Sequence, residues 1–300
     1  MSPLIAAIEA GGTKFNCAVG TGPGDIRLSK RIPTTKPGET LQEVIAFFDE
    51  AQKQCGAFAA IGVASFGPLD LDESSAHYGF ITTTPKPGWQ NADLLGPLRA
   101  RFDVPVGFDT DVNGAALGEH LWGAGQGSDP LVYLTIGTGI GGGVFVNGKL
   151  LHGMLHPEIG HIQVPLPQTS APNPACVCPF HTSCLEGYIS GPALEKRWGA
   201  CAETFSPTHE IWQEFATVMA LGLANIILTL SPRRIILGGG VMHQSHIFPM
   251  IRAEVTRLLN GYVQTRELIS DIEHYIVPPG LGDDSGILGA VALGTSALKK

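Results

Sequence analysis

Charged side chains are scarce in this chain of 300 residues, and positive charge is the scarcer sign. Asp, Glu, Lys and Arg together make up 15% of the residues, whereas an average protein has about 25%. The 27 acidic and 19 basic side chains leave a formal net charge of −8, and Lys and Arg stand together in no block longer than a pair. Because a non-specific nucleic-acid binder needs a basic face, we expect no nucleic-acid partner.

An export signal and a long apolar run are also missing. Residues 1–3 carry no positive charge, and Glu9 interrupts the apolar stretch at residues 4–8 before it reaches the length of a signal core. The longest apolar run, at residues 219–230, contains Asn225 and is shorter than the roughly 20 residues of a membrane-spanning helix. These absences predict a cytoplasmic protein that does not enter a membrane.

Apolar residues and glycine are what the chain has instead. Apolar residues make up 44%, which excludes a disordered chain, and the length fits about two domains of roughly 150 residues each. Glycine accounts for 39 residues, about 13% where about 7% is usual. Many glycines and few charges predict places where the backbone, rather than a side chain, contacts a ligand.

Short apolar strands alternate with helical segments along the chain, which is typical of an α/β fold with mixed parallel and hairpin pairing. The strands are expected at residues 4–9, 15–19, 59–64, 104–109, 130–136, 143–146 and 234–237, and the helices at residues 40–55, 113–122, 211–230, 249–259 and 285–298. Thr40 is the expected cap of the first helix. A loop rich in Pro and Cys is expected at residues 165–184.

Two glycine-rich turns each join a pair of these strands, at residues 11–14 (GGTK) and 137–139 (GTG). Backbone N–H groups and Thr hydroxyls at such a tip can bind a polyphosphate, although a structural turn explains either one alone. Two tips of the same pattern favour a nucleotide site. Residues 137–142 (GTGIGG) also match the dinucleotide pattern G-x-G-x-x-G, but a strand follows where that fold requires a helix, which disfavours an NAD-dependent dehydrogenase. A third cluster, at residues 238–240, is either a tight turn or a surface for a base and ribose.

Three polar residues mark the junction between an expected strand and an expected helix, namely Asp109, Asp111 and Asn113. Asp or Asn before a helix is most often a cap, and Asp109 or Asn113 can fill that role. Asp111 is then left for another purpose, at a helix start where the partial positive charge favours an ionised carboxylate.

A zinc site is predicted in the Cys-rich loop. Cys178, His181 and Cys184 follow one another at steps of three residues, and His161 is the candidate fourth ligand. The alternative is a set of free thiols, and Cys176 is an ambiguous extra cysteine. The other three cysteines are expected to be core thiols, and the other histidines surface or packing residues.

Five segments together resemble the ROK sugar kinases, in order and in spacing. They are residues 9–14 (EAGGTK), 111–119 (DVNGAALGE), 136–139 (IGTG), 158–161 (EIGH) and 178–191. The resemblance covers essentially the whole chain and is closest to the bacterial fructokinase branch, which shares ITTTPKPGW at residues 81–89, DTD at 109–111 and CPFH at 178–181.

The resemblance implies an actin-like, ribonuclease-H-like two-domain ATPase fold, with mixed sheets and helices on both faces. The implied small N-terminal domain is residues 1–112, with a C-terminal helix at 286–300 packed back on it. The implied large domain is residues 113–285, with a zinc-binding loop at 161–184. The two domains of such a protein close over a sugar and Mg-ATP.

The resemblance also assigns roles to particular residues. Asp111 is the catalytic base, zinc is bound by the four residues named above, and Glu9 is a possible magnesium ligand through water, where most of the family has Asp. The residues expected to bind the sugar are Gly67, Thr110, Glu158, His161 and Glu186. The residues expected to bind ATP are Gly11, Gly12, Thr13, Lys14, Thr138, Gly139, Gly191, Gly239 and Gly240. Glucose-specific relatives carry Asn in place of Thr110, which argues against glucose.

The expected function is therefore an ATP-dependent fructokinase that forms fructose 6-phosphate, with Mg²⁺ and structural Zn²⁺, as a homodimer. A mannokinase or glucokinase of broad hexose specificity is the alternative. The family also contains sugar-responsive transcription regulators, which carry a helix-turn-helix segment ahead of the kinase-like domain. The first strand is expected near Leu4, which leaves no room for that segment, and the charge of −8 also disfavours DNA binding.

Overall fold

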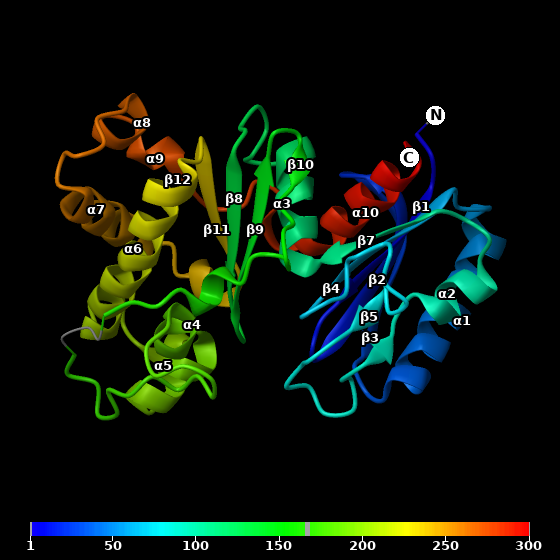
Figure 1. The fold of residues 1–300 in the computed structure, drawn as a ribbon, viewed down its shortest axis with the longest axis horizontal. Helices are drawn as coiled ribbons and strands as arrows, with labels where there is room; N and C mark the ends of the chain where they lie inside the picture. The colour runs from blue at the N-terminus through cyan, green and yellow to red at the C-terminus, as the bar shows by residue number, and fades with distance from the viewer. Residues whose placement is uncertain (1, 166–168, 300) are drawn as a thin grey trace. The chain divides into compact units, whose positions relative to one another are not determined.

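The computed structural model describes residues 2–165 and 169–299, and the chain packs into two compact units (Figure 1). Unit 1 consists of Met1–Gln126, Leu150–His156 and Asp283–Lys300. Unit 2 consists of Gly127–Lys149 and Pro157–Gly282. The chain therefore crosses between the units several times, and each unit is built from separate stretches of sequence.

Unit 1 contains a five-stranded sheet in the order β3-β2-β1-β4-β7. Its strands are β1 (Ile5–Ala10), β2 (Lys14–Gly22), β3 (Asp25–Pro33), β4 (Ala60–Ser65) and β7 (Val106–Thr110), and a separate small ribbon pairs β5 (Phe80–Ile81) with β6 (Ala92–Asp93). β2 is antiparallel to β1 and β3, whereas β4 and β7 continue parallel to β1. β1 and β4 are almost entirely buried, as expected for apolar strands at the centre of a sheet covered on both faces.

The helices of unit 1 are α1 (Pro37–Cys55), α2 (Gly96–Arg101), α3 (Asp111–Trp122) and α10 (Ser285–Ala297). α10 packs on β1, β4 and β7 and against α3 (Figure 1). The approach is close, because a Cβ placed on Gly289 would lie 2.3 Å from the carbonyl carbon of Gly114, and one placed on Gly62 would lie 1.8 Å from the carbonyl oxygen of Ala290. Small residues at these positions let α10 reach both the sheet and α3.

Unit 2 repeats this sheet, in the order β10-β9-β8-β11-β12. Its strands are β8 (Leu131–Ile136), β9 (Ile140–Val146), β10 (Lys149–Leu150), β11 (Arg234–Gly238) and β12 (Ile276–Val277). β8 and β9 form an antiparallel hairpin, and β11 and β12 continue parallel to β8. The predicted repeat of a glycine-tipped hairpin is thus confirmed, and in each unit the hairpin leads a sheet of the same pattern.

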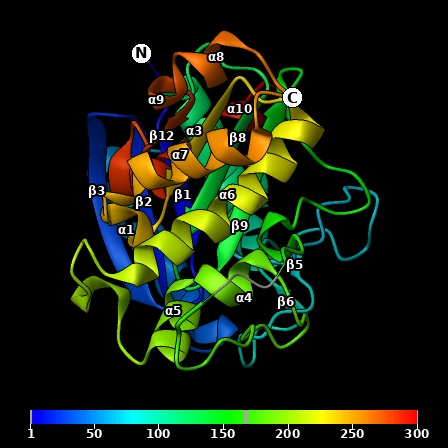
Figure 2. The ribbon, with the colours of Figure 1, turned by 90° about the vertical axis from the view of Figure 1, so that its left-hand side faces the viewer.

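The helices of unit 2 are α4 (Leu185–Ile189), α5 (Gly191–Trp198), α6 (Glu210–Leu230), α7 (Ile247–Leu259), α8 (Arg266–Ile269) and α9 (Ile272–Tyr275). Figure 2 shows α6 and α7 lying across the sheet of this unit, and the two helices contact one another. Within the described residues, α6 is long and apolar enough to cross a membrane, but 67% of the relevant window is buried inside the structure. That burial makes it weak evidence for a membrane span.

Four short 3-10 helices complete the described elements, namely η1 (Ile159–His161), η2 (Ala202–Thr204), η3 (Gly240–His243) and η4 (Gly282–Asp284). α3 packs with unit 1, so the division of the chain falls after Gln126, whereas the sequence places a boundary at residue 112. The expected Pro- and Cys-rich loop includes residues 166–168, which lie outside the described residues.

Two expectations about local structure are wrong. α1 begins at Pro37, and the residue before it, Lys36, makes no side-chain cap, so Thr40 lies inside the helix rather than capping it. β3 is absent from the expected strands because it is an exposed edge strand in which Ile32 is the buried residue. Ile26, Leu28 and Ile32 fall on alternate positions of this strand, but Lys30 interrupts the apolar pattern.

Candidate functional site

Three predicted segments of unit 1 leave the sheet at the same edge. β1, β4 and β7 are parallel neighbours, with Ala10 paired to Ser65 and Ser65 paired to Thr110 at their carboxyl ends. The chain continues from these ends into the first glycine tip, into the turn that contains Gly67, and into Asp111. In open α/β sheets, ligands bind outside the carboxyl ends of the strands, so the order of strands brings these residues to one place.

Asp111 is the first residue of α3, directly after β7. Thr110 caps this helix, since its Oγ1 accepts the N–H of Asn113 at 3.1 Å. The expectation that Asp109 or Asn113 is the cap is therefore wrong. Asp111 Oδ1 accepts the N–H of Val112 at 2.9 Å, and the partial positive charge of the helix start stabilises a carboxylate there.

Asp109 is buried at the end of β7, accepts two hydrogen bonds and lies within ion-pair distance of a histidine. Its Oδ1 accepts the Thr110 N–H at 2.8 Å and Asn113 Nδ2 at 2.7 Å, and its Oδ2 lies 2.8 Å from His152 Nε2. Asp109 is 3% exposed. A buried carboxylate is stable when donors surround it, so this residue organises the junction from which Asp111 projects.

A second histidine of the same segment contacts the Gly67 turn. His156 is 7% exposed, and its Nε2 accepts the backbone N–H of Leu69 at 3.2 Å. A Cβ placed on Gly67 would lie 3.3 Å from the same nitrogen. From the sequence, both His152 and His156 are expected to be surface or packing residues, and no spacing pattern marks them, because their partners are far away in sequence.

The first glycine tip is a tight turn with one open side. Gly11 N–H donates to the Lys14 carbonyl at 2.9 Å, and Thr34 Oγ1 donates to the Gly11 carbonyl at 2.7 Å. A Cβ placed on Gly12 would meet nothing within 4 Å, and Thr13 and Lys14 are exposed. The hydrogen bonds of Gly11 therefore fix the turn, while its tip stays open to a ligand.

Glu9 lies on β1 just before this tip. Asn16 Nδ2 donates to its Oε2 at 2.7 Å, and a Cβ placed on Gly286 would lie 2.2 Å from its Oε1. Burial raises the pKa of the Glu9 carboxyl above its ordinary value; the Asn16 hydrogen bond and the charges of Lys14 and Arg31 lower it, and the negative charge of Asp284 raises it. A carboxylate held among such neighbours gains from a nearby cation, which fits a water-mediated magnesium ligand.

The second glycine tip, at residues 137–139, lies at the matching edge of the unit 2 sheet. β9 begins at Ile140, so a strand and not a helix follows the G-x-G-x-x-G segment, and the dinucleotide-binding interpretation is excluded. Gly239 follows β11, the parallel neighbour of β8, with φ +89°. A Cβ placed on Gly239 would lie 2.5 Å from the backbone nitrogen of Ile136, so glycine is required where β11 passes the end of β8.

Glu186 and Gly191 are tied to this second tip. Glu186 Oε2 accepts the Ile140 N–H at 2.9 Å, and a Cβ placed on Gly139 would lie 2.8 Å from the same oxygen. The Gly191 N–H donates to the Gly137 carbonyl at 2.8 Å. The structure thus brings these predicted residues together, and it shows that the Gly191 N–H stabilises the tip rather than pointing to a phosphate.

Glu158 and Glu186 are electrostatic neighbours. Glu158 keeps much of its surface exposed, yet the surrounding protein desolvates it in part, and this raises the pKa of its carboxyl, with the charge of Glu186 adding to the increase. The oxygens of a carboxyl group accept hydrogen bonds from hydroxyl groups. Their arrangement suits a ligand rich in hydroxyls.

Two thiols and two imidazoles form a candidate metal centre in unit 2. The ligand atoms of His161, Cys178, His181 and Cys184 all lie within 4.8 Å of one another. Cys178 Sγ lies 3.4 Å from His181 Nδ1 and 4.0 Å from His161 Nδ1. Tetrahedral Zn²⁺ with ordinary bond lengths separates a sulfur and a nitrogen ligand by about 3.6 Å, so the set fits zinc.

Cys176 stands outside this set of four. Its Sγ donates to the His181 carbonyl at 3.3 Å, and a Cβ placed on Gly187 would lie 2.1 Å from that sulfur. The structure therefore favours Cys178 over Cys176 as the ligand. Burial raises the pKa of the Cys184 thiol to about 12. A bound metal ion would lower that pKa, because it coordinates the thiolate.

The profile of the ROK family matches residues 5–297. The chain belongs to the ROK family. It is 46% identical to a protein named putative fructokinase from Bacillus subtilis (strain 168), over 99% of this chain and 97% of that protein. It is 42% identical to the fructokinase of Zymomonas mobilis, over 99% and 98%. Among solved structures, a ROK-family glucokinase from Streptomyces griseus in complex with glucose and AMPPNP is 25% identical, with a TM-score of 0.73 and coverage of 98% and 99%.

These similarities confirm the family and the fold expected from the sequence. The ROK-like folding pattern accounts for the two sheets of equal topology and for the helices on their faces. It also explains why the short motifs of this chain, from residues 9–14 to 178–191, all fall at strand ends or at helix starts.

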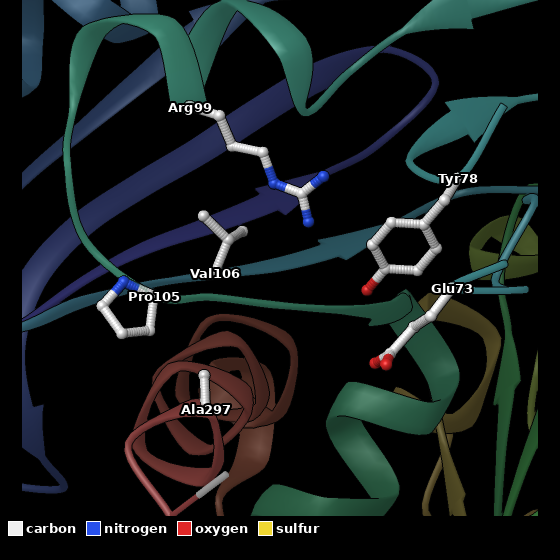
Figure 3. A pocket seen from close by; sticks show the side chains of 6 residues that line it. All are labelled: Glu73, Tyr78, Arg99, Pro105, Val106 and Ala297. Atoms are coloured by element: carbon white, nitrogen blue, oxygen red, sulfur yellow. The ribbon is translucent and has the colours of Figure 1, made fainter. Parts of the chain in front are cut away.

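A pocket elsewhere in this ROK-family chain contains none of the predicted residues. It measures about 490 Å³ in unit 1 and is lined by Glu73, Tyr78, Arg99, Pro105, Val106 and Ala297 (Figure 3). Figure 3 shows Arg99 and Tyr78 pointing toward one another, and the guanidinium lies 5.1 Å from the ring centroid. The pocket lies at the start of β7, whereas Asp111 follows its end, so it is separate from the candidate site.

Proposed function

We propose that this protein is an ATP-dependent fructokinase, which transfers the γ-phosphoryl group of Mg-ATP to the 6-hydroxyl of D-fructose. The observation that carries the proposal is similarity over the full chain: five relatives named as fructokinases or putative fructokinase are 40–46% identical to it. The streptomycete relative, solved with glucose and AMPPNP, supports a sugar and a nucleotide as the two ligands.

Asp111 is the proposed catalytic base. Its place at the first turn of α3 stabilises the carboxylate, and a carboxylate can accept the proton of the attacking hydroxyl. Phosphoryl transfer passes through a loose transition state, so orienting that hydroxyl matters more than base strength. The two hydrogen bonds on neighbouring Asp109 and its contact with His152 support a fixed orientation of the junction.

The phosphates are proposed to bind at the two glycine tips. The donors are backbone N–H groups and hydroxyls of Gly11, Gly12, Thr13, Lys14, Thr138 and Gly139, while Gly239 and Gly240 face the base and ribose, and Gly191 fixes the second tip. Mg²⁺ would neutralise phosphate charge when bound, and Glu9 would hold one of its waters. The buried, charge-disfavoured carboxylate of Glu9 supports that role.

The sugar hydroxyls are proposed to bind Glu158, His161 and Glu186, together with the backbone at Gly67. The raised pKa of Glu158, caused by desolvation and by the charge of Glu186, supports this assignment. Thr110 is 3% exposed and caps α3, so we propose that it acts on the sugar by shaping the first turn of α3 rather than by touching it.

A structural zinc ion is proposed to hold this sugar-binding group together. His161 closes η1, which Glu158 precedes, and Cys184 caps α4, accepting the Gly187 N–H at 3.4 Å. His161 Nδ1 faces Cys178, so Nε2 on the far side of the ring can donate to a hydroxyl. The zinc would then position Glu158, His161 and Glu186 without taking part in phosphoryl transfer.

A side-by-side assay of sugars tests the proposal. The rate of ATP consumption, coupled to ADP detection, is measured with fructose, mannose, glucose and N-acetylhexosamines. Fructose is expected to give the highest kcat/KM. A broad hexose kinase is the second candidate, and equal kcat/KM for fructose and glucose would establish it in place of the first.

We also propose that the protein is a cytoplasmic homodimer. It is proposed to have no nucleic-acid partner, in line with the charge of −8.

A further inference from the structure

The segment Leu150–His156 lies between two stretches of unit 2 in the sequence, yet it packs with unit 1. Two of its side chains make the recorded polar contacts with that unit: His152 contacts Asp109, and His156 contacts the backbone of Leu69. Both contacts reach the sheet edge that carries the candidate catalytic residue. The segment is therefore placed to influence that edge.

The hydrogen positions on His152 follow from its neighbours. Asp109 Oδ2 lies 2.8 Å from His152 Nε2, and a carboxylate oxygen only accepts, so we assign the ring hydrogen that faces it to Nε2. Asn113 Nδ2 lies 3.4 Å from the same nitrogen, but it already donates to Asp109 Oδ1 at 2.7 Å. His152 and Asn113 are therefore two donors that meet on one carboxylate.

Asp109 passes this constraint on to the start of α3. Of its three donors, the Thr110 N–H and Asn113 Nδ2 belong to the β7–α3 junction itself, and His152 alone comes from a distant part of the chain. Thr110 and Asn113 flank Asp111 in sequence, and Thr110 Oγ1 also accepts the Asn113 N–H. A rotation of the Asp109 carboxylate would thus move Thr110 and Asn113, which lie one residue before and two residues after Asp111.

We propose that His152 is a positioning residue: by fixing the buried Asp109 carboxylate through Nε2, it holds the first turn of α3 and with it the orientation of Asp111. The inference rests on the proposed role of Asp111 as base. It assigns a function to a side chain that is 41% exposed and whose partner is 4% exposed. An exposed histidine bound to a buried carboxylate is a costly arrangement for packing alone, because Asp109 could be buried more cheaply as Asn.

Replacement of His152 by Ala removes one of the three donors from Asp109. The expected result is a kcat lowered by about 10- to 100-fold with the KM for fructose within about threefold of wild type, because orientation of the base and not sugar affinity is lost. His152→Gln places an amide N–H where Nε2 was and is expected to restore kcat to within about threefold of wild type. His152→Glu offers no donor when ionised and is expected to be at least as slow as His152→Ala.

His274 provides a matched control in unit 2. Its Nδ1 lies 2.5 Å from Asp271 Oδ1, and its side chain is 78% exposed, so it forms a pair of the same chemistry outside the candidate site. His274→Ala is expected to leave kcat and KM unchanged. Melting temperatures of all variants are measured in parallel, and His152→Gln keeps the test decisive should His152→Ala unfold.

The outcomes separate this inference from the proposed function. A wild-type kcat in His152→Ala would overturn the inference, and so would a low kcat that His152→Gln does not restore. A raised KM with an unchanged kcat would also overturn it, because His152 would then be a sugar contact. Asp111→Asn is assayed in the same series. Normal turnover in Asp111→Asn overturns the role of Asp111 and the positioning role with it, whereas an inactive Asp111→Asn beside a fully active His152→Ala overturns the positioning role alone.

Discussion

Asp109 and Asp111 are two residues apart on the same strand–helix junction, and the fold gives them opposite environments. Asp109 is enclosed by polar partners at the end of β7, whereas Asp111 begins α3 and its Oδ1 accepts the N–H of Val112. The sequence singles out Asp111 as the candidate catalytic base, and this role stays a prediction. It assigns the cap incorrectly, because a Thr hydroxyl competes with Asp and Asn for that role and the difference between them is small.

Asp111→Asn is expected to lower kcat about 10³-fold, since an amide cannot accept the hydroxyl proton, while KM and the melting temperature change little. Steady-state kinetics and circular dichroism measure the two effects. Asp103→Asn is the control, because it makes the same chemical change at an exposed position of unit 1 outside the site. Near-normal turnover in Asp111→Asn would remove this residue from its proposed role.

Glu9 predicts a stability effect that depends on pH. Burial raises the pKa of its carboxyl in the folded protein, so ionisation costs more in the folded than in the unfolded state, and the contribution of Glu9 to stability falls as pH rises through the raised pKa. Glu9→Gln does not titrate there. We expect it to be more stable than wild type at pH 8 and no more stable at pH 4, as measured by urea unfolding, with a reduced kcat at limiting Mg²⁺.

Glu39 serves as a control of opposite sign. Hydrogen bonding to Thr35 and the charge of Lys36 lower the pKa of this exposed carboxyl at the start of α1. Its ionised form therefore favours the folded state, and Glu39→Gln is expected to be no more stable than wild type at pH 8. A Glu9→Gln variant that is less stable than wild type at pH 8 would contradict the assignment of burial as the dominant effect.

The histidines show where residue-level prediction ends. His161 and His181 could be assigned from spacing, because their partners Cys178 and Cys184 lie in the same loop or just beyond it, and the structure brings all four together. His152 has a partner 43 positions earlier in the sequence, at Asp109, which no local pattern reveals. No periodicity or motif in a single sequence indicates the contact between His152 and Asp109.

At the scale of elements, the zinc loop and α4 are connected through Cys184. Cys184 is both a ligand in the proposed zinc site and the cap of α4, and α4 carries Glu186, which binds the second glycine tip through Ile140. Metal binding at the loop is thereby connected to the residues proposed to hold the sugar. The sequence predicts the loop, but it misses α4 and α5, because helices of 5 and 8 residues show too few turns for a periodic pattern.

Elemental analysis of purified untagged protein is expected to find about one zinc per chain. Cys178→Ser is expected to lose it, to melt about 5–10 °C lower, and to show a higher KM for fructose, since α4 loses its fixed start. Cys176→Ser is the matched control from the same loop, and it should keep both its zinc and its KM. Wild-type protein without zinc, or loss of zinc from Cys176→Ser alone, would contradict the assigned ligand set.

At the scale of the whole molecule, two sheets of the same topology place the glycine tips at equivalent strand ends. This repetition can be predicted from the sequence, because a hairpin tip is a local feature and its pattern, first at Gly11, recurs at Gly137. The assignment of α3 to unit 1 was not readable, since it depends on packing against α10 at the other end of the chain. Gly114 and Gly289 are small residues at the contact between α3 and α10, and no apolar pattern in the sequence shows that these two helices pack together.

The net charge of −8 predicts how nucleotide binding responds to salt. A protein that holds phosphates with clustered Lys and Arg loses affinity steeply as ions screen the attraction. Here backbone donors and Mg²⁺ are proposed to hold them, Lys14 is the cation in the first tip, and the molecule as a whole repels a polyanion. Screening then removes a repulsion as well as an attraction, so the two effects offset one another.

The KM for Mg-ATP is therefore expected to change by less than about threefold between 0.05 and 0.3 M NaCl, with fructose saturating. Lys14→Ala is expected to change the KM for Mg-ATP by a similar factor at every NaCl concentration, because it removes a single charge from a site where the backbone makes most of the contacts with the phosphates. Wild-type KM is measured by initial rates at constant free Mg²⁺. A tenfold rise of KM across that range would mean that side-chain charge, and not the glycine backbone, carries the binding of ATP.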